Sequence, residues 1–331
     1  MLNSTYTDST GLIAARCIIC SVGIVANLLV IIVMIYNNIF KKSLTHTLLL
    51  HQSVVDFLGC CLFLGFYNND APSTNNATFF CKARVIFWYM SSTSTYNLVM
   101  VTFERYIAVL HPLLYRARKV SLRRKIPLSI PHCLGLLSSL QLAIFAEADD
   151  EHPGECMYNY NGEKSTRIIS GVLLFTMYWL IPVSIMSYCY TCILLNLRRK
   201  QKEVGRERDG SRIQRNLLYT LVLVSVAFLV TVTPNFVLYL VYCICDCFAF
   251  SKVTIHEVTV LMNTSNLCIN PFIYCFNFKE FQRGMRKMKR EIKEKMFSKK
   301  WHTRSVSCSK VSDNTNLDNR PSQVVSIIAV S

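Results

Sequence analysis

Charged residues are scarce in this chain. Only 17% of its 331 residues are Asp, Glu, Lys or Arg, and 52% are hydrophobic, whereas about a quarter of an average soluble domain is charged. This shortage excludes an ordinary soluble domain and indicates a membrane protein. A cleavable signal peptide is also missing, because MLNSTYTDST has no basic region and no apolar core. We expect the first apolar stretch to act as its own insertion signal.

Seven apolar stretches follow one another along the chain. Each has about 20 residues or more, the length that crosses a bilayer core of about 30 Å. Only helices satisfy their backbone inside lipid without closing a barrel, so the sequence predicts an all-α membrane protein with a seven-transmembrane domain, residues 12–276. The predicted spans are 12–36, 45–67, 82–106, 126–146, 168–196, 214–243 and 253–276. The fourth is the weakest, because prolines, serines and His132 dilute it.

Positive charge is unevenly placed. All but six of the 36 Lys and Arg residues lie at or beyond the far ends of the first, third, fifth and seventh stretches. Lys and Arg stay on the cytoplasmic side of short loops, so we expect residues 1–11 outside the cell and the C-terminus inside. The net charge of +16 then faces anionic lipid and partners at the inner membrane surface. Nucleic acid is not an expected partner, because the basic residues flank membrane spans.

The predicted outer side carries two further signals. Asn3 and Asn76 begin the triplets NST and NAT, which are glycosylation acceptors, whereas a third match at Asn263 lies inside a span and is discounted. Cys81 and Cys156 both lie on this side, where an oxidising exterior permits a disulfide between them. A second outer bridge is left open, with the candidates Cys17, Cys243, Cys245 and Cys247.

Polar residues inside the spans are costly and are functional by default. Asp56 is the only carboxylate in the middle of any span, and leaving it charged and unpartnered would cost about 2.5–3.5 kcal/mol. Side chains at comparable depth are Asn27, Ser94, Asn266 and Asn270. These groups either hydrogen-bond across helices or form a hydrated cation site, since hard cations take oxygen ligands. The residues alone leave both readings open.

The third stretch ends in an acid and a base, Glu104 and Arg105. Residues spaced three or four apart in that stretch share one helical face, which ends at Arg105. They are Phe87, Ser91, Ser94, Leu98, Val101 and Arg105. A guanidinium at the end of such a face can exchange one acceptor for another, so the pair has the makings of a two-state latch. The plainer alternative is an interfacial ion pair.

Further motifs join this pair in a fixed order. They are Asn27 in GIVANLLV, Asp56, the pair Cys81 and Cys156, Glu104-Arg105-Tyr106 with Pro112, Pro182 with Tyr190, Phe228 with Pro234, and NPFIY from Asn270 and Pro271 to Tyr274. With these motifs the chain resembles the rhodopsin-like (class A) G-protein-coupled receptors over all seven spans, of the orphan or peptide-receptor kind.

The resemblance implies roles for particular residues. Arg105 would release Glu104 on activation and face a heterotrimeric G protein, and Tyr190 and Tyr274 would swing inward beside it. The full set implied to carry coupling and activation is Glu104, Arg105, Tyr106, Pro112, Tyr190, Phe228, Pro234, Asn270, Pro271 and Tyr274. The implied allosteric sodium site consists of Asp56, Ser94, Asn266 and Asn270. No other cofactor is expected.

The chain departs from the family pattern at several points. Val232 stands where the family has a Trp two residues before the helix-six proline, so Phe228 is left to carry that rearrangement. His132 lies near the point where the fourth helix usually has a Trp. Gln214 offers no acid near the inner end of the sixth span, so a full latch from Arg105 to that helix is not expected.

The ligand is constrained mainly by what is missing. No acid lies near Phe87, which disfavours a monoamine, and no lysine lies in 253–276, which excludes retinal. The candidate ligand-binding residues are Phe87, Ser91, His256 and Glu257. Acidic residues in EADDEHPGE would attract a basic peptide by long-range steering, although a solvated acidic loop explains them equally well.

The segment after the seventh span is basic and amphipathic. Met and other apolar residues repeat every three or four positions between lysines and arginines, which predicts a short eighth helix, residues 277–297, lying on membrane lipid. Residues 298–331 are rich in Ser, Thr and Asn, and we expect them to form a disordered cytoplasmic tail. Its hydroxyls suit phosphorylation by a receptor kinase and binding of arrestin.

The sequence therefore predicts a plasma-membrane receptor that transmits binding of an extracellular ligand, most plausibly a peptide, to a heterotrimeric G protein. It is not expected to be an enzyme, because no nucleophile–base pair or metal-ligand cluster is recognisable. The alternative is a seven-helix cation channel or transporter with Asp56 in the permeation path. A pore has no need of Arg105 and NPFIY at its inner face.

Overall fold

The computed structural model describes residues 10–72, 76–117, 122–204, 209–245 and 254–296. Two compact units are present, Met1–Gly284 and Met285–Ser331. The predicted glycosylation site at Asn3, the side chain of Gln214 and the tail 298–331 lie outside the description. Everything below concerns the first unit unless the second is named.

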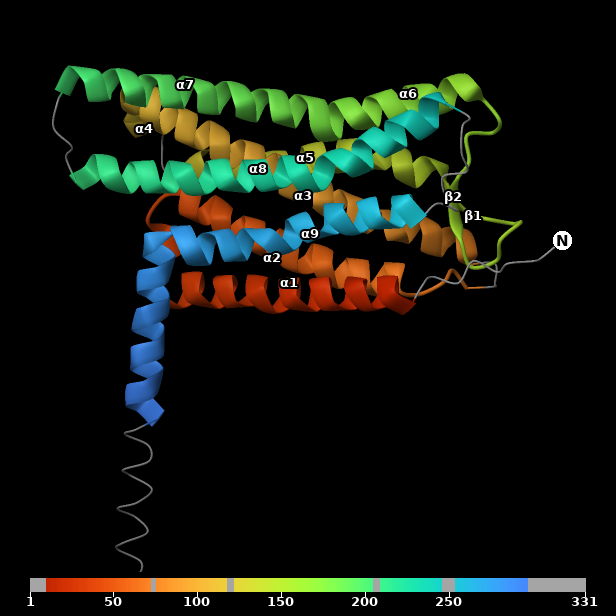
Figure 1. Cartoon of the computed structure of the whole chain (residues 1–331), viewed down its shortest axis with the longest axis horizontal. Coiled ribbons are helices and arrows are strands. Elements are labelled where there is room, and N and C mark those ends of the chain that lie inside the picture. The colour runs from red at the N-terminus through yellow and green to blue at the C-terminus, as the bar shows by residue number, and fades with distance from the viewer. Residues whose placement is uncertain (1–9, 73–75, 118–121, 205–208, 246–253, 297–331) are drawn as a thin grey trace, which may run out of the picture. The chain divides into compact units, whose positions relative to one another are not determined.

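The helices agree with the predicted spans. They run side by side, with the β1–β2 hairpin at one end of the bundle and α4 at the other (Figure 1). The elements are α1 Thr10–Tyr36, η1 Ile39–Lys41, α2 Leu44–Tyr67, α3 Ala77–Leu110, α4 Pro112–Ala117, α5 Leu122–Phe145, β1 Ala146–Ala148, β2 Cys156–Tyr158, α6 Lys164–Phe175, η2 Thr176–Leu180, α7 Ile181–Val204, α8 Asp209–Ile244 and α9 Thr254–Asn277. Most helices extend a few residues beyond the predicted apolar stretch, into the polar residues that flank it.

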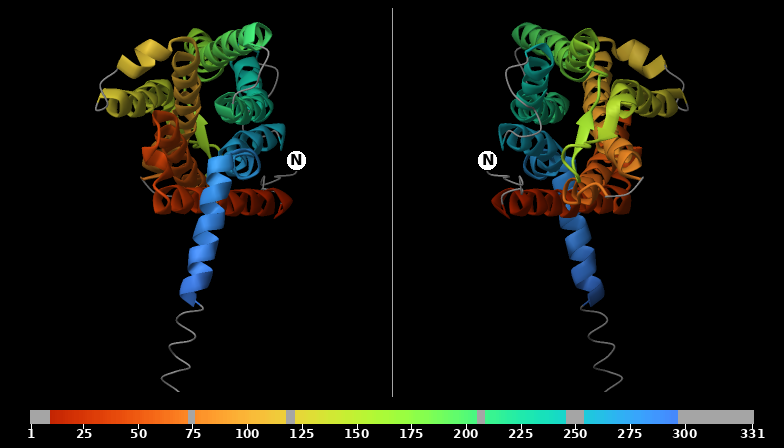
Figure 2. Two further views of the ribbon diagram at one scale, coloured as in Figure 1. Left: turned by 90° about the vertical axis from the view of Figure 1, so that its left-hand side faces the viewer. Right: turned by 90° about the vertical axis from the view of Figure 1, so that its right-hand side faces the viewer.

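We call the end with the hairpin the disulfide end and the opposite end the Arg105 end; Figure 2 views the bundle from each. At the disulfide end, Cys81 of α3 is bonded to Cys156 of β2, which confirms the predicted disulfide. The hairpin, with Ala146 opposite Tyr158, was not foreseen from the sequence. At the other end α3 stops at Leu110, before Pro112, as a helix usually does ahead of a proline.

Five segments of the described chain are long and apolar enough to cross a membrane by composition alone: Thr10–Tyr36, Leu44–Tyr67, Lys125–Phe145, Lys164–Arg199 and Val222–Ile244. The two other long helices, α3 and α9, carry many polar side chains. Those side chains are buried inside the protein, from Ser91 to Asn97 on α3 and from Asn263 to Asn270 on α9. Mean hydropathy therefore underestimates the ability of α3 and α9 to span a membrane. In contrast, α5, which corresponds to the weakest apolar stretch of the sequence, is apolar enough to cross one.

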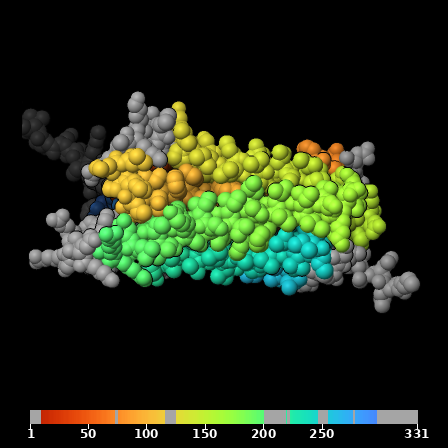
Figure 3. Space-filling model, turned by 90° about the horizontal axis from the view of Figure 1, so that it is seen from above, coloured from red at the N-terminus to blue at the C-terminus, as the bar shows by residue number. Residues whose placement is uncertain are grey.

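The outward faces are apolar. Figure 3 shows one side of the bundle, on which α5, α6 and α7 are in view. These helices expose large apolar side chains, including Leu137, Leu140, Ile169, Leu173 and Leu195. Apolar exposure on this scale is unsuited to water and suited to lipid.

The fifth predicted span is interrupted by a π-helical turn, η2. Each N–H in a π-helix bonds the carbonyl five residues back, so Pro182, which has no N–H, leaves the Met177 carbonyl without its helical donor. The Tyr96 hydroxyl of α3 donates to that carbonyl at 2.8 Å. The carbonyl group that the proline leaves without a helical donor is thus hydrogen-bonded by a side chain of α3.

Residues 279–296 are helical as well, although their position on lipid remains a prediction. At the start of this helix Glu280 accepts from Lys42 at 3.1 Å and lies 3.0 Å from His46. The nearby His46 ring, aided by Lys42, lowers the pKa of Glu280 from its ordinary value of 4.5 to about 2.

Candidate functional site

A buried polar cluster surrounds Asp56 at the middle of α2. The carboxylate is fully buried and accepts from Ser94 of α3 at 2.7 Å, from Asn270 of α9 at 2.8 Å, and from Gln52 at 3.0 and 3.2 Å. Gln52 also donates to Ser94. Asp56 therefore joins three helices through hydrogen bonds, as a buried carboxylate must.

Of the three residues that the resemblance placed with Asp56 in a sodium site, two contact it and one does not. Ser94 and Asn270 are present as expected, whereas Asn266 accepts from Thr231 of α8 at 3.5 Å. Gln52, which sequence reasoning missed, takes the place beside the carboxylate. The signal was available, because a polar residue four positions before Asp56 lies on the same helical face.

A chain of hydrogen bonds extends from Gln52 to α5. Asn97 Nδ2 donates to Gln52 Oε1 at 2.7 Å, and its Oδ1 lies 2.9 Å from His51 Nδ1. His51 Nε2 lies 2.9 Å from His132 Nε2, and His132 Nδ1 lies 2.8 Å from the Tyr89 hydroxyl. His132 of α5 is thus connected to α2 and α3 by hydrogen bonds at both of its ring nitrogens.

The cluster offers ligands that a small hard cation prefers. Asp56 provides a carboxylate, Ser94 a hydroxyl, and Asn27 and Asn270 provide amide oxygens. Asn27 Oδ1 and Asn270 Oδ1 are buried and have no hydrogen-bond partner in the described part of the chain. Oxygen donors of this kind suit a cation such as sodium better than a transition metal. The described residues contain no group of three or more His, Cys, Asp or Glu side chains placed to hold a metal ion.

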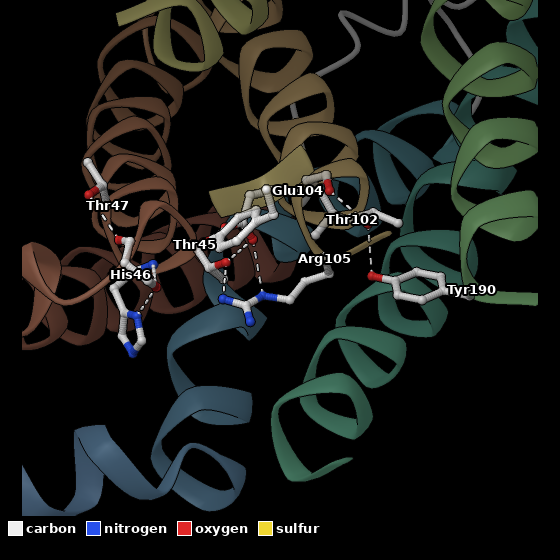
Figure 4. Close-up of polar contacts among 10 residues, drawn as sticks. Thr45, His46, Thr47, Thr102, Glu104, Arg105 and Tyr190 are labelled. Carbon is white, nitrogen blue, oxygen red and sulfur yellow. Dashed lines mark hydrogen bonds and ion pairs between the residues drawn. The ribbon is translucent and has the colours of Figure 1, made fainter. Parts of the chain in front are cut away.

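Glu104 and Arg105 form part of a polar lock at the Arg105 end, shown in Figure 4. Arg105 Nε lies 3.2 Å from Glu104 Oε2, as an ion pair without the direction of a hydrogen bond. Thr45 of α2 bridges the pair, donating to Glu104 and accepting from Arg105. The Tyr115 hydroxyl donates to the other Glu104 oxygen at 2.8 Å. We call Thr45, Glu104, Arg105 and Tyr115 the Arg105 lock.

The lock is more enclosed than an ordinary surface ion pair. The side chain of Glu104 is 5% exposed and that of Arg105 is 14% exposed. Surface pairs contribute about 0–1 kcal/mol, but hydrogen bonds to charged groups contribute about 1.5–3 kcal/mol each. Thr45 and Tyr115 therefore hold Glu104 more firmly than the neighbouring charges alone would.

The other residues of the predicted activation set lie on α3, α4, α7, α8 and α9. Tyr190 of α7 is buried, and its hydroxyl lies 2.9 Å from Thr102 (Figure 4) and accepts from Ser225 at 3.3 Å. Tyr274 is buried, and its hydroxyl has no partner in the described chain. Tyr106 stacks on Phe103, with ring centroids 6.3 Å apart. Of the remaining members, Phe228 is fully buried, Pro234 and Pro271 lie inside α8 and α9, and Pro112 is exposed.

A cavity of about 640 Å³ opens at the disulfide end. Its wall includes Arg84 and Trp88 of α3, Tyr158 of β2, Phe236 of α8 and Glu257 of α9. Because the disulfide fixes β2 to α3, the hairpin forms part of this wall. A volume of this size is typical of a ligand site.

The four predicted ligand residues divide into two groups. His256 and Glu257 line the cavity, and Glu257 is paired with the buried Arg16. Phe87 and Ser91 are not among the lining residues. Phe87 is fully buried against Phe63 and Tyr67, and Ser91 accepts from Asn263 at 3.4 Å.

The structure describes some of the other residues that were predicted to lie on the outer side. Asn76 is exposed. Cys245 is disulfide-bonded, whereas Cys17 and Cys243 are free thiols. Cys247 lies outside the described residues. The second bridge that the sequence left open therefore involves Cys245.

Comparison with known proteins gives the family. The model of the 7 transmembrane receptor (rhodopsin family) matches residues 26–274, and this chain belongs to that family. It is a multi-pass membrane protein and a receptor by family.

Similar proteins include somatostatin receptor type 4 of Rattus norvegicus, which is 27% identical over 87% of this chain and 75% of its own length. Galanin receptor 2b of Danio rerio is 24% identical over 86% of this chain and 76% of its own length. G-protein coupled receptor 183 of Mus musculus is 24% identical over 82% of this chain and 80% of its own length.

Proposed function

We propose that this protein is a plasma-membrane receptor that binds an extracellular peptide in the cavity at the disulfide end and activates a heterotrimeric G protein at the Arg105 end. The N-terminus lies outside the cell. One observation carries the proposal: α3 lines the ligand-sized cavity with Trp88 and holds Arg105 in a polar lock at its other end. A single helix thus connects the two sites.

The peptide class rests on the relatives. Two of them are named as receptors for somatostatin and galanin, which are peptides. The acidic residues Asp70 and Glu155 in the cavity wall are consistent with a peptide that carries positive charge. The alternative of a cation channel or transporter finds no support, because the matching family is one of receptors.

Activation, in this proposal, begins with release of the Arg105 lock. Arg105 leaves Glu104 and Thr45 and turns toward the G protein, and Tyr190 and Tyr274 move in beside it. The buried Tyr274 hydroxyl has no partner in the described residues, so movement to a polar partner would be favourable. Phe228 and the proline-containing parts of α8 and α9 would accommodate the rearrangement, since proline weakens a helix at that point.

Sodium is proposed as an allosteric ion at Asp56. Ser94, Asn27 and Asn270 supply the further oxygen atoms, and a cation held between α2, α3 and α9 favours the arrangement that keeps these ligands together. An agonist that prefers another arrangement must then bind less tightly in sodium, by thermodynamic linkage. Asn266, which contacts α8, would join the site only after a side-chain movement.

Other partners follow from the position of the chain in the membrane. Glycosylation is proposed at Asn3 and Asn76, of which Asn76 is exposed. A receptor kinase and arrestin are proposed to act on the hydroxyl-rich tail, residues 298–331. Lipid headgroups are proposed to bind the basic residues of the helix that follows α9.

The direct test is a peptide library applied to cells that express the receptor with a pooled G-protein reporter. At least one peptide should raise the reporter in wild type, and Arg105→Ala should abolish that response at equal surface expression. A response that persists in Arg105→Ala would contradict the coupling proposal. A steady cation conductance lost in Asp56→Asn would favour a channel instead.

A further inference from the structure

One arginine in the cavity wall has no carboxylate partner among the described residues. Arg16 and Arg84 both line the cavity. Arg16 is paired with Glu257, and it donates to the Tyr67 carbonyl at 2.9 Å. Arg84 instead lies over the ring of Tyr67, with its guanidinium carbon 3.8 Å from the ring centroid. The positive charge of Arg84 is therefore available to an anionic group that enters the cavity.

The ring under Arg84 is held rigidly. Tyr67 stacks on Phe63 with centroids 4.6 Å apart, and Phe87 meets it edge-on at 5.3 Å. Phe63 and Phe87 are fully buried. The attraction between a cation and an aromatic ring holds the guanidinium of Arg84 over Tyr67, and its five N–H donors lie in its own plane. Arg84 is thus positioned before any ligand arrives, which lowers the entropy cost of binding.

The surroundings of Arg84 favour a particular kind of ligand. Trp88 is one helical turn from Arg84 on the same face of α3, and both line the cavity together with Phe236 and Tyr239. An anionic group at Arg84 would therefore have an aromatic surface beside it. Because the planar fork of arginine matches a carboxylate through two parallel hydrogen bonds, the best-matched anion is a carboxylate next to an apolar or aromatic side chain.

We propose that Arg84 is the anchoring site for a carboxylate of the peptide ligand, with the adjoining side chain packed on Trp88 and Phe236. This inference rests on the proposed function and specifies the chemistry of its ligand. The carboxylate comes either from the free C-terminus of the peptide or from an Asp or Glu side chain. The acidic wall residues Asp70 and Glu155 remain able to attract positive charge elsewhere on the same peptide.

The test measures binding to purified full-length receptor in nanodiscs, without G protein. Three hexapeptide pools are offered: free acids without Asp or Glu, C-terminal amides without Asp or Glu, and amides that contain one Asp or Glu. Retained peptides are identified by mass spectrometry and their Kd values measured. The first pool reports a C-terminal carboxylate and the third a side-chain carboxylate, and preference for either over the second pool supports the proposal.

Three variants complete the test. Arg84→Gln should weaken the selected peptide about tenfold to a hundredfold, the range expected for charge-assisted hydrogen bonds, and should remove the preference over the plain amide pool. Arg84→Lys keeps the charge and should retain part of the preference. Arg167→Gln is a matched control, because Arg167 lies over the Tyr242 ring at 5.7 Å but does not line the cavity; it should bind as wild type does.

Two results would overturn the proposal. One is equal retention of all three pools, or of none, by wild type. The other is a carboxylate preference that survives in Arg84→Gln. Failure here is separate from failure of the proposed function, because binding is measured without coupling. A carboxylate-selective peptide that stimulates no G protein would count against the receptor proposal and leave the assignment of Arg84 intact.

Discussion

Replacing Thr45 by valine removes the hydroxyl that bridges the Arg105 lock. This hydroxyl donates to Glu104 and accepts from Arg105, and valine has nearly the same shape without either capacity. If the lock belongs to the resting state, its contacts are lost on activation, so Thr45→Val destabilises the resting state relative to the active one. The expected change is higher signalling without ligand.

The magnitude follows from the burial of the pair. A hydrogen bond to a charged group contributes about 1.5–3 kcal/mol, and the two contacts of Thr45 share one hydroxyl, so their contributions do not simply add. We take the loss as that of one such bond. Since about 1.4 kcal/mol changes a ratio tenfold, the active-to-resting ratio should rise roughly tenfold to a hundredfold.

The assay is reporter activity without ligand, normalised to surface receptor. Thr47→Val is the matched control, because Thr47 lies half a turn further along α2 and donates only to the backbone of Phe40 and Ser43. Glu104→Gln should also raise the signal, whereas Arg105→Ala should abolish it. If Thr45→Val signals no more than wild type and Thr47→Val, the lock does not restrain activation and the reasoning fails.

Further predictions concern the ion site, the disulfide and Glu280. Replacing sodium by choline should lower the Tm of purified wild-type receptor, through loss of a ligand bound to the folded state, and should leave Asp56→Asn unchanged; equal sensitivity would refute a sodium site there. Changing Cys81 to serine should cost about 2–5 kcal/mol of stability and reduce surface receptor, whereas Cys133→Ser, at an exposed free thiol, should not. Because the pKa of Glu280 is lowered to about 2, its contribution is complete above its ordinary value of 4.5 and is lost as the pH falls toward 2. Glu280→Gln should therefore lower the Tm at pH 7, by an amount that shrinks as acid is added, and a constant difference would contradict this.

The sequence was sufficient for the order and approximate positions of the long helices. Spans in a bilayer must be long, apolar and helical, so composition alone located them, and the family match confirms the bundle. The Cys81–Cys156 disulfide was also predictable, because few cysteines lie on the predicted outer side. Such features depend on the length and composition of each segment and on its side of the membrane, which can be predicted from the sequence.

Contacts between distant helices were predicted less completely. The position of Asn266 toward α8 depends on the rotation of α9, which the spacing of its asparagines does not determine. Thr45 and Tyr115 were missed for a related reason: each contacts Glu104 only because α2, α3 and α4 meet at one end of the bundle. The sequence predicted only the pair of neighbouring charges, whereas the structure encloses it with two further hydrogen bonds.

Arg84 shows a third kind of limit. In the sequence it is one basic residue on the predicted outer side, with nothing to distinguish it from Lys82 or Arg167. Its importance arises from the position of Tyr67 beneath it and from the pairing of the neighbouring Arg16 with Glu257. Charge balance inside a cavity requires knowledge of which charges are already neutralised, and only the folded structure contains that information.

The central claim is that this chain activates a G protein through Arg105. The most direct measurement is guanine-nucleotide exchange on a panel of purified heterotrimeric G proteins, each incubated with nanodiscs that contain wild-type receptor, Arg105→Ala or no receptor. We predict that wild type accelerates exchange on at least one G protein and that Arg105→Ala matches empty nanodiscs. Acceleration that is equal for wild type and Arg105→Ala, or absent across the panel even with a peptide bound in the cavity, would contradict the account.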